Sequence, residues 1–283
     1  MTDARLPLQL AAELPRLYLP LAAWLNRQRP GDGPLLVGVN GSQGSGKSTL
    51  CTLLKWILEA AFDCHTGIIS IDDLYLPKSV RRQLAETVHP LLATRGVPGT
   101  HDVKLGIKLL AQLQQTGAGR KIALPRFSKA DDDRLPPRDW GQITTPVEVV
   151  LFEGWCVGAT PQTEAQLQKP INRLEAEEDA DGTWRRYVNE QLRGPYHKLF
   201  DRLDLLLMLQ IPDWEMVYHW RRRQEQQLAA KDNGNGIMSE TELRRFIMHY
   251  ERLTRHQSAT LPQVADLTLK LNQQQRVTAV RLR

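Results

Sequence analysis

One eight-residue segment near the N-terminus has the residue types and spacing that bind phosphate groups. Residues 41–48 read GSQGSGKS and match the pattern G-x-x-x-x-G-K-[ST]. In this pattern glycines let main-chain N–H groups converge on phosphate oxygens, and the following helix adds its positive dipole end. We expect Lys47 to act in catalysis at the β- and γ-phosphates of ATP and Ser48 to bind Mg²⁺. The residues expected to surround the nucleotide are Gly41, Ser42, Gln43, Gly44, Ser45, Gly46, Lys47, Ser48 and Thr49.

A second segment ends an apolar strand in two carboxylates. Residues 68–71 read IISI and are followed by Asp72 and Asp73. A base that accepts a proton from a substrate hydroxyl must lie beside the γ-phosphate, and a strand end is a rigid place to hold it. We therefore expect Asp72 to be the general base, with Asp73 as its helper. Helix capping or Mg²⁺ binding without a base role is the alternative for these carboxylates.

A third segment, residues 147–152, reads VEVVLF and ends at another acid, Glu153. A buried strand that finishes in an acid is typical of Walker B segments, in which the carboxylate holds Mg²⁺ directly or through water. Glu153 is therefore a candidate for metal binding and for orienting the substrate hydroxyl, unless its role is structural.

Phosphoryl transfer onto an anionic acceptor needs fixed positive charge. Two anions about 4 Å apart repel by roughly 4 kcal/mol at an effective dielectric constant of 20. One loop offers Arg126, Lys129 and Arg134. A helix expected over residues 213–228 offers Arg221, Arg222 and Arg223, of which Arg221 and Arg222 are our candidates for a lid that closes over ATP. Alternatively, these arginines are solvated surface charges.

The elements that must position these residues alternate between strand and helix. Apolar runs at residues 35–39, 67–71, 147–152, 203–211 and 265–271 indicate strands, and periodic leucines predict helices over 48–61 and 103–113. This alternation predicts an α/β, three-layer P-loop NTPase fold with a mainly parallel central sheet, helices on both faces, and helical insertions or a lid.

We expect an N-terminal helical segment over residues 1–34 and a kinase domain over 35–283. Within that domain, residues 76–141 hold substrate loops, with irregular stretches at 83–101 and 126–141 that reach over the strand ends. Residues 161–195 form a polar insertion, and we interpret 161–185 as solvated, with a helical subdomain as the alternative. The lid region covers about 213–240.

Composition narrows the class of protein without naming a ligand. The 283 residues carry a net charge of +5, which suits nucleic acid, an anionic membrane or a phosphorylated small molecule. No helix-turn-helix, RNA-binding or zinc motif is present, so we expect no nucleic-acid partner. No apolar run approaches the roughly 20 residues of a membrane span. The three widely spaced cysteines suit a reducing cytoplasm, where we place the protein.

Taken together, the segments resemble the plant-type D-glycerate 3-kinase family, within the wider group of phosphoribulokinase, uridine kinase and pantothenate kinase. The segments that carry the resemblance are GSQGSGKSTL from Gly41, SIDDLYLP from Ser70, HPLLATRGVPGTHD from His89, LFEGWCVG from Leu151, VYHWRRRQEQ from Val217 and GIMSETELRRF from Gly236.

The resemblance implies ATP and Mg²⁺ as cofactors and D-glycerate as the first candidate acceptor, converted to 3-phosphoglycerate. It supports Asp72 as base and Glu153 as the acid of the F-E-G segment. It further implies acceptor contacts by the Gly99–Asp102 block and by Arg126 and Arg134, whose guanidinium groups suit a carboxylate. The acceptor contacts that we expect are Asp73, Tyr75, His101, Asp102, Arg126 and Arg134.

Residues 127–134, FSKADDDR, depart from the family pattern on the acceptor side. A nucleoside, a pantothenate-like compound or a sugar therefore stays open as the acceptor. A nucleotide-regulated binding protein is the alternative from a different class.

Overall fold

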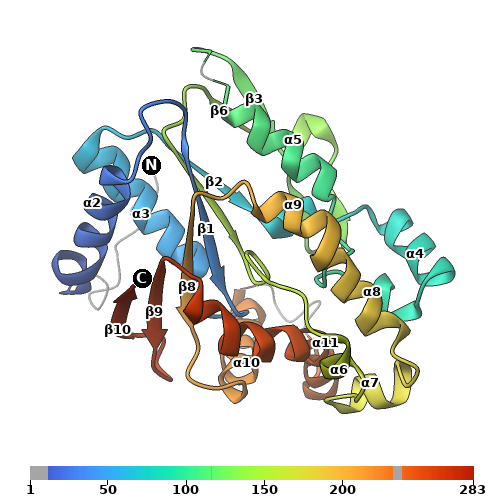
Figure 1. Cartoon of the computed structure of the whole chain (residues 1–283). Helices are drawn as coiled ribbons and strands as arrows, with labels where there is room; N and C mark the ends of the chain where they lie inside the picture. Colours follow the sequence, from blue (N-terminus) through green and yellow to red (C-terminus); the bar gives the residue numbers. More distant parts are fainter. Residues whose placement is uncertain (1–11, 116, 232–237) are drawn as a thin grey trace.

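The computed structural model of the chain describes residues 12–115, 117–231 and 238–283. The first part of the predicted N-terminal segment and residues 232–237 of the predicted lid region lie outside the described residues. Figure 1 shows a central sheet with helices on both of its faces. In sheet order, the six strands are β10 (Val277–Leu282), β9 (Leu267–Leu271), β8 (Leu205–Gln210), β1 (Leu35–Gly41), β7 (Val149–Gly154) and β2 (Thr66–Ser70).

All neighbouring strands of this sheet run parallel except β10, which pairs antiparallel with β9 at the edge. β1 lies between β7 and β8, and each of its residues is buried. Burial on both faces explains why this strand reads as an unbroken apolar run rather than an alternating one. Because parallel strands end at the same edge, the ends of β1, β7 and β2 lie together, with Val39 and Ser70 both opposite Glu153.

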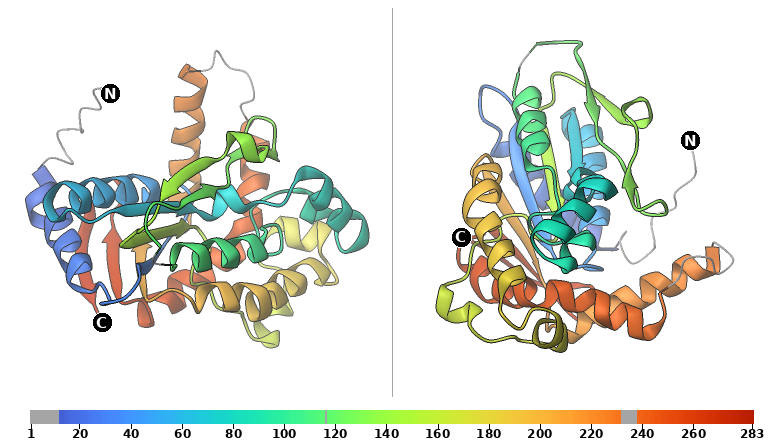
Figure 2. Two further views of the ribbon diagram at one scale, coloured as in Figure 1. Left: turned by 90° about the horizontal axis from the view of Figure 1, so that it is seen from above. Right: turned by 90° about the vertical axis from the view of Figure 1, so that its right-hand side faces the viewer.

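The two faces of the sheet are covered by different helices. Val37 and Leu151 pack with α2, α3 and α10, whereas Leu36 and Val150 pack with α5, η5, α9 and α11. The views in Figure 2 show these layers from two further sides. The covering helices are η1 (Leu14–Tyr18), α2 (Leu19–Arg27), α3 (Lys47–Phe62), α5 (Val103–Leu113), η5 (Leu192–Tyr196), α9 (His197–Phe200), α10 (Glu215–Lys231) and α11 (Glu240–Thr260).

Shorter elements surround this core. Two small antiparallel pairs join β3 (Lys121–Leu124) with β6 (Gly141–Thr144) and β4 (Phe127–Ser128) with β5 (Asp133–Arg134). The remaining short helices are η2 (Ile71–Leu74), α4 (Lys78–Thr87), η3 (Pro90–Ala93), η4 (Pro137–Asp139), α6 (Glu164–Leu167), α7 (Arg173–Glu178), α8 (Thr183–Gln191) and η6 (Leu261–Gln263). No helix in the described part of the chain is long and apolar enough to cross a membrane.

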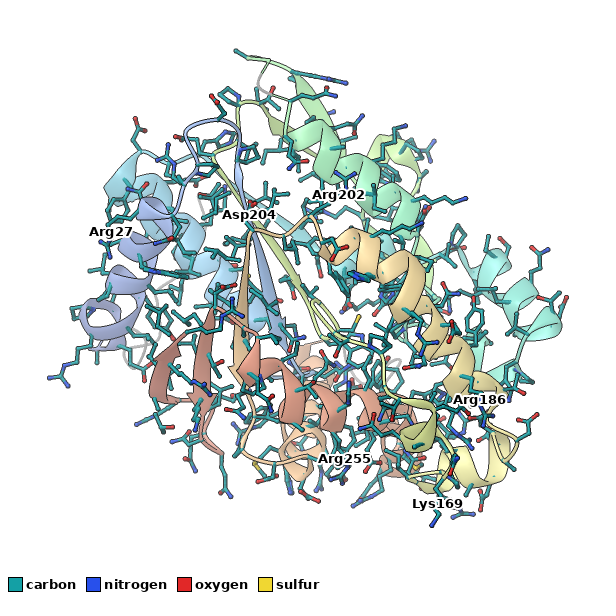
Figure 3. All side chains as sticks on the ribbon, in the orientation of Figure 1. Arg27, Lys169, Arg186, Arg202, Asp204 and Arg255 are labelled. Carbon is teal, nitrogen blue, oxygen red and sulfur yellow. The ribbon has the colours of Figure 1, made fainter. Side chains whose placement is uncertain are left out.

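Basic side chains extend from several sides of the molecule. Figure 3 shows Arg27 on α2 at one edge of the molecule and Lys169 at the opposite edge, with Arg255 on α11 between them. All three residues are exposed. The positive charge of the chain is therefore not confined to one face.

The predicted α/β, three-layer fold with a mainly parallel sheet is confirmed. The five predicted strands and the helices at 48–61 and 103–113 are present within a few residues of their expected bounds. The antiparallel strand β10 was not predicted, since its residues are largely exposed and give no apolar run. The stretch 83–101, expected to be irregular, begins inside α4 and contains η3.

Most residues of the stretch 161–185 are exposed, as predicted, and the stretch also contains the helices α6, α7 and α8 that the alternative would require. Two of its acids depart from the prediction of a solvated stretch. Glu175 and Asp179 are almost completely buried, and Arg252 and Arg185 neutralise them. Arg252 donates to both oxygens of Glu175, at 2.7 and 2.6 Å. A charged side chain can be buried when it is paired and hydrogen-bonded. The Glu175–Arg252 pair therefore attaches α7 to α11, and the Asp179–Arg185 pair links the end of α7 to α8, whereas Glu177 and Glu178 of the same acidic run are exposed.

Candidate active site

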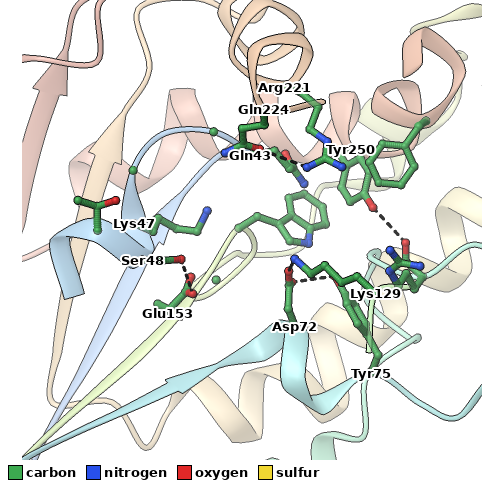
Figure 4. A pocket seen from close by; sticks show the side chains of 17 residues that line it. Gln43, Lys47, Ser48, Asp72, Tyr75, Lys129, Glu153, Arg221, Gln224 and Tyr250 are labelled. Atoms are coloured by element: carbon green, nitrogen blue, oxygen red, sulfur yellow. Dashed lines mark hydrogen bonds and ion pairs between the residues drawn. The ribbon is translucent and has the colours of Figure 1, made fainter. Parts of the chain in front are cut away.

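A cavity lies at the shared edge where β1, β2 and β7 end. Figure 4 shows Lys47, Ser48 and Glu153 on one side of this cavity and Tyr75, Lys129 and Tyr250 on the other, with Asp72 between them. The lining residues are Gln43, Gly44, Gly46, Lys47, Ser48, Thr49, Asp72, Tyr75, Arg95, Lys129, Glu153, Gly154, Trp155, Arg221, Gln224, Phe246 and Tyr250.

The glycine-rich loop joins β1 to α3 along one wall of the cavity. Gly44 and Gly46 have φ angles of 75° and 93°, in the left-handed region that glycine tolerates best. Lys47 is the first residue of α3, and its Nζ donates to the main-chain oxygen of Ser42 at 3.0 Å. Burial lowers the Lys47 pKa, whereas the charges of Glu153 and Asp72 act in the opposite direction.

Helix α10 packs directly on this loop. A Cβ atom built on Gly44 would lie 2.6 Å from Cβ of Trp220, which is closer than non-bonded carbons approach. Trp220 is buried, and its Nε1 donates to the main-chain oxygen of Gln273 at 2.9 Å. The N-terminal half of α10 therefore forms part of the wall around the loop.

Ser48 and Glu153 bring two oxygen ligands together beside Lys47. Ser48 Oγ donates to Glu153 Oε1 at 2.9 Å, and Glu153 is 6% exposed at the end of β7. In the described residues, no group of three or more His, Cys, Asp or Glu side chains could hold a metal ion. A pair of hydroxyl and carboxylate oxygens nevertheless fits Mg²⁺, which typically uses few protein ligands and completes its shell with water and phosphate oxygens.

Asp72 lies in η2, just beyond the end of β2, and its carboxylate has two hydrogen-bond partners. The Tyr75 hydroxyl donates to Oδ1 at 2.8 Å, and Lys129 Nζ donates to Oδ2 at 2.9 Å. Burial alone would raise the Asp72 pKa, but Lys129, the Tyr75 hydroxyl and Lys47 outweigh it and lower the pKa to about 2. This carboxylate is therefore ionised at neutral pH.

Tyr75 is held in place by aromatic neighbours. Its ring stacks on His101 with the centroids 4.6 Å apart, and the His101 Nδ1 lies 2.5 Å from the Tyr196 hydroxyl. Burial lowers the His101 pKa to about 4, so the imidazole is neutral at pH 7. This stack fixes the ring whose hydroxyl orients Asp72.

Aromatic side chains also form the wall opposite the glycine-rich loop. The rings of Trp155 and Tyr250 meet edge to face at 4.9 Å, and Phe246 packs on Tyr250 at 5.0 Å. The hydroxyl of Tyr250 donates to the main-chain oxygen of Arg95 at 3.0 Å. The wall is thus largely apolar, and the guanidinium groups of Arg95 and Arg221 reach the same cavity.

A second cavity continues on the other side of the glycine-rich loop. It shares Gly44, Gly46, Thr49 and Gln224 with the first and extends to Trp220 and to the turn between β9 and β10. Gln275 in that turn donates to the main-chain oxygen of Gly44. The loop therefore lies between the first cavity, whose lining includes the charged residues Lys47, Asp72 and Glu153, and the second cavity, whose lining includes more aliphatic side chains.

Comparison with known proteins identifies the family. No family model matches the chain. A chloroplastic D-glycerate 3-kinase of Arabidopsis thaliana is 29% identical over 267 residues, which cover 88% of this chain. An uncharacterized kinase of Schizosaccharomyces pombe is 31% identical over 229 residues, which cover 78% of this chain and 80% of the yeast protein. The chain belongs to this family of P-loop kinases.

Solved structures agree with this assignment. The D-glycerate 3-kinase of Cryptococcus neoformans matches this kinase with a TM-score of 0.77 at 25% identity, covering 97% of this chain and 99% of the other. The match to the plant relative covers only 56% of that protein, so this kinase spans a little over half of its length.

Most of the residues predicted to bind nucleotide and metal line the cavity of the kinase, together with the predicted base, one predicted acceptor contact and one predicted lid residue. Gln43, Gly44, Gly46, Lys47, Ser48, Thr49, Asp72, Tyr75, Glu153 and Arg221 all line it. Ser45 lines the second cavity. Gly41 ends β1 below the loop, where a Cβ atom would lie 2.6 Å from Ser45 Oγ, and Ser42 contributes the main-chain oxygen that Lys47 contacts.

Five predicted acceptor contacts do not line the cavity. Asp73 accepts from Arg126 Nη1 at 2.7 Å and from the main-chain N–H of Phe127 at 3.1 Å, which attaches the 126–134 loop to η2. Arg134 binds Asp102 and the main-chain oxygen of Tyr75. Asp102 also caps α5, through Leu105 N–H. His101 lies behind Tyr75.

Of the two predicted lid residues, only Arg221 reaches the cavity. It pairs with Glu225 at 2.5 Å and lies over the Phe246 ring. Arg222 is exposed and does not line the cavity. Helical periodicity places adjacent residues about 100° apart, so two neighbouring arginines cannot face the same ligand equally.

Sequence reasoning missed the residues of the aromatic wall. Trp155, Phe246, Tyr250 and Arg95 line the cavity, and none had been assigned to the site. Arg95, Trp155 and Phe246 lie inside the segments that carry the family resemblance. The segments alone could not single them out, because loop residues have no periodicity that indicates which side chain faces a cavity.

Proposed function

We propose that this kinase transfers the γ-phosphoryl group of ATP to a hydroxyl of D-glycerate, giving 3-phosphoglycerate. The observation that carries the proposal is one cavity in which an ionised carboxylate, Asp72, faces the phosphate-binding loop and Lys47. D-glycerate is the acceptor named for the plant and Cryptococcus relatives.

In this proposal, ATP lies along the glycine-rich loop. The first cavity takes the phosphates, and the second, bordered by Trp220, takes the adenosine. Lys47 contacts the β- and γ-phosphates, and Ser48 and Glu153 hold Mg²⁺. When bound, Mg²⁺ neutralises the charge on the transferred phosphoryl group and fixes its orientation.

Asp72 acts as the general base. One of its oxygens accepts the proton of the acceptor hydroxyl as that hydroxyl attacks the γ-phosphorus, and the bond from phosphorus to the ADP oxygen breaks. Each carboxylate oxygen has a second acceptor site beyond its bond to Tyr75 or Lys129, so the acceptor hydroxyl can bind without displacing either. Proton transfer of this kind contributes about 10²- to 10⁴-fold to a rate.

The remaining cations lie near the phosphoryl group, on which negative charge is spread during its transfer. Lys129 adds a positive charge beside Asp72, and Arg221 extends from α10 on the opposite side. The aromatic wall of Trp155, Phe246 and Tyr250 limits water near the phosphoryl group, which favours transfer to the acceptor over hydrolysis.

The test is a coupled ADP assay with ATP, Mg²⁺ and D-glycerate, with Lys47→Ala as the blank. We expect ADP release that depends on D-glycerate. If ADP is released only with a nucleoside, pantothenate or a sugar, the acceptor assignment is wrong and the kinase class stands. No release with any acceptor in the panel would contradict the proposed activity.

We also propose a cytoplasmic location. It is supported by the three cysteines, Cys51, Cys64 and Cys156, each of which is buried and unpaired.

A further inference from the structure

We propose that Arg95 binds the carboxylate of the acceptor and thereby selects an acid over a neutral polyol. The inference rests on the kinase function proposed above and names the residue that decides its acceptor class. Arg95 lines the same cavity as Asp72 but lies on the segment between η3 and α5, not on the loop predicted to grip the acceptor.

The main chain at Arg95 is fixed from three directions. Its carbonyl accepts from the Tyr250 hydroxyl at 3.0 Å, the carbonyl of Gly96 accepts from Trp155 Nε1 at 2.8 Å, and Gly96 N–H donates to Thr100 Oγ1 at 2.9 Å. A guanidinium group on a fixed main chain loses less entropy when it binds an anion.

Gly96 explains why the chain can approach Tyr250 so closely. Its φ angle is 130°, and a Cβ atom there would lie 2.1 Å from the Tyr250 hydroxyl oxygen. Any other residue would push the aromatic wall away or release the carbonyl of Arg95. The contact therefore couples the position of Arg95 to the wall of the cavity.

The charges around Arg95 leave it with positive charge to offer a ligand. Asp132 pairs with Arg95 through Oδ1 and with Arg81 through Oδ2, the latter at 3.0 Å. One carboxylate thus serves two guanidinium groups. Arg81 is buried and also donates to the carbonyls of Leu76, Ala93 and Asp132.

Arg95, by contrast, is 25% exposed and reaches the cavity. The neighbouring Lys129 is paired with Asp72, so it does not supply an uncompensated charge to the acceptor. The excess positive charge on this side of the cavity therefore belongs to Arg95.

This arrangement suits a short hydroxy acid. A guanidinium group binds a carboxylate through paired N–H donors, and Arg95 keeps donors beyond the one that contacts Asp132. Asp72 and Arg95 line one cavity, so a small acceptor can present its hydroxyl to the base and its carboxylate to the cation. Glycerol has the hydroxyl without the carboxylate and is the matched neutral acceptor.

The experiment compares Arg95→Gln with the unchanged protein and with Arg138→Gln. Arg138 lies in η4, is 85% exposed and does not line the cavity. For Arg95→Gln we expect the KM for D-glycerate to rise about 10- to 100-fold, because a charged hydrogen bond contributes about 1.5–3 kcal/mol. We expect the KM for ATP and the rate with glycerol to stay within about twofold, and Arg138→Gln to behave as the unchanged protein.

A binding titration with D-glycerate in the absence of turnover accompanies the kinetics, with the melting temperature of each protein as a check on folding. If the substitution weakens D-glycerate binding although no acceptor is phosphorylated, the Arg95 assignment stands and the proposed activity fails. If D-glycerate binds both proteins equally, or if the KM for ATP rises instead, the Arg95 assignment is wrong whatever the activity. A folded Arg95→Gln protein that retains the preference for D-glycerate over glycerol would also overturn it.

Discussion

The contact between Gly44 and Trp220 can be tested by comparing two glycines of the same loop. Gly44 and Gly46 both have left-handed φ angles, 75° and 93°. An alanine Cβ at position 46 would meet no atom within 4 Å, whereas at position 44 it would lie 2.6 Å from Trp220 Cβ and 3.3 Å from its carbonyl carbon. Backbone strain is thus common to both substitutions, and steric overlap is confined to Gly44→Ala.

The expected free energies follow from this difference. A left-handed conformation costs an alanine about 1–2 kcal/mol, so Gly46→Ala should lower the free energy of unfolding by roughly that amount. Gly44→Ala should lower it by a further 1–3 kcal/mol or so, because α10 has to move away from the loop.

Urea denaturation without nucleotide, followed by circular dichroism, measures both values while no phosphate contact can interfere. Intrinsic fluorescence, to which Trp220 contributes as one of seven tryptophans, should also shift in Gly44→Ala alone, because only that substitution moves this side chain. If the two variants unfold at the same urea concentration, α10 does not pack on the loop as described.

Two further predictions concern charge. Lys129→Met should move the acid limb of the kcat/KM profile to higher pH, since loss of the ammonium raises the Asp72 pKa from about 2 and the ionised base is then lost at a higher pH. An acid limb that stays in place would mean that Lys129 does not control this base. Arg252→Met should lower the free energy of unfolding by about 3–5 kcal/mol because it leaves Glu175 buried without its partner. Arg173→Met, at an exposed pair, should leave the urea midpoint almost unchanged, and equal losses would contradict the buried pairing.

The sequence predicts the core of this kinase well because its signals are local. Fewer than about twenty consecutive residues suffice to predict each of its main features. These features are the strand that leads to Gly41, the helix that begins at Lys47, and the acids at the ends of β2 and β7. Parallel strands then bring Asp72 and Glu153 to the same edge, so their proximity follows from the fold class alone.

The wall of the cavity that faces the glycine-rich loop could not be predicted in the same way. Arg95, Trp155 and Tyr250 are far apart in the sequence, and only the packing of α11 against the loop after η3 brings them together. Arg126 has the same chemistry as Arg95, but Asp73 holds it away from the cavity. The acidic composition around Glu175 predicted a solvated side chain, but Glu175 is buried. The sequence does not distinguish a buried acid from a solvated one, because it does not show that Arg252 pairs with it.

The measurement that tests the account most directly is single-turnover phosphoryl transfer by Asp72→Asn. The amide keeps the shape of the side chain but removes the negative charge and the ability to accept a proton. Asp73→Asn is the comparator, because the Asp73 carboxylate binds Arg126 and Phe127 outside the cavity. We predict that Asp72→Asn binds ATP within about twofold of the unchanged protein and transfers phosphate roughly 10²- to 10⁴-fold more slowly, with a smaller loss for Asp73→Asn. Transfer by Asp72→Asn within about twofold of the unchanged protein would contradict the assignment of Asp72 as the base.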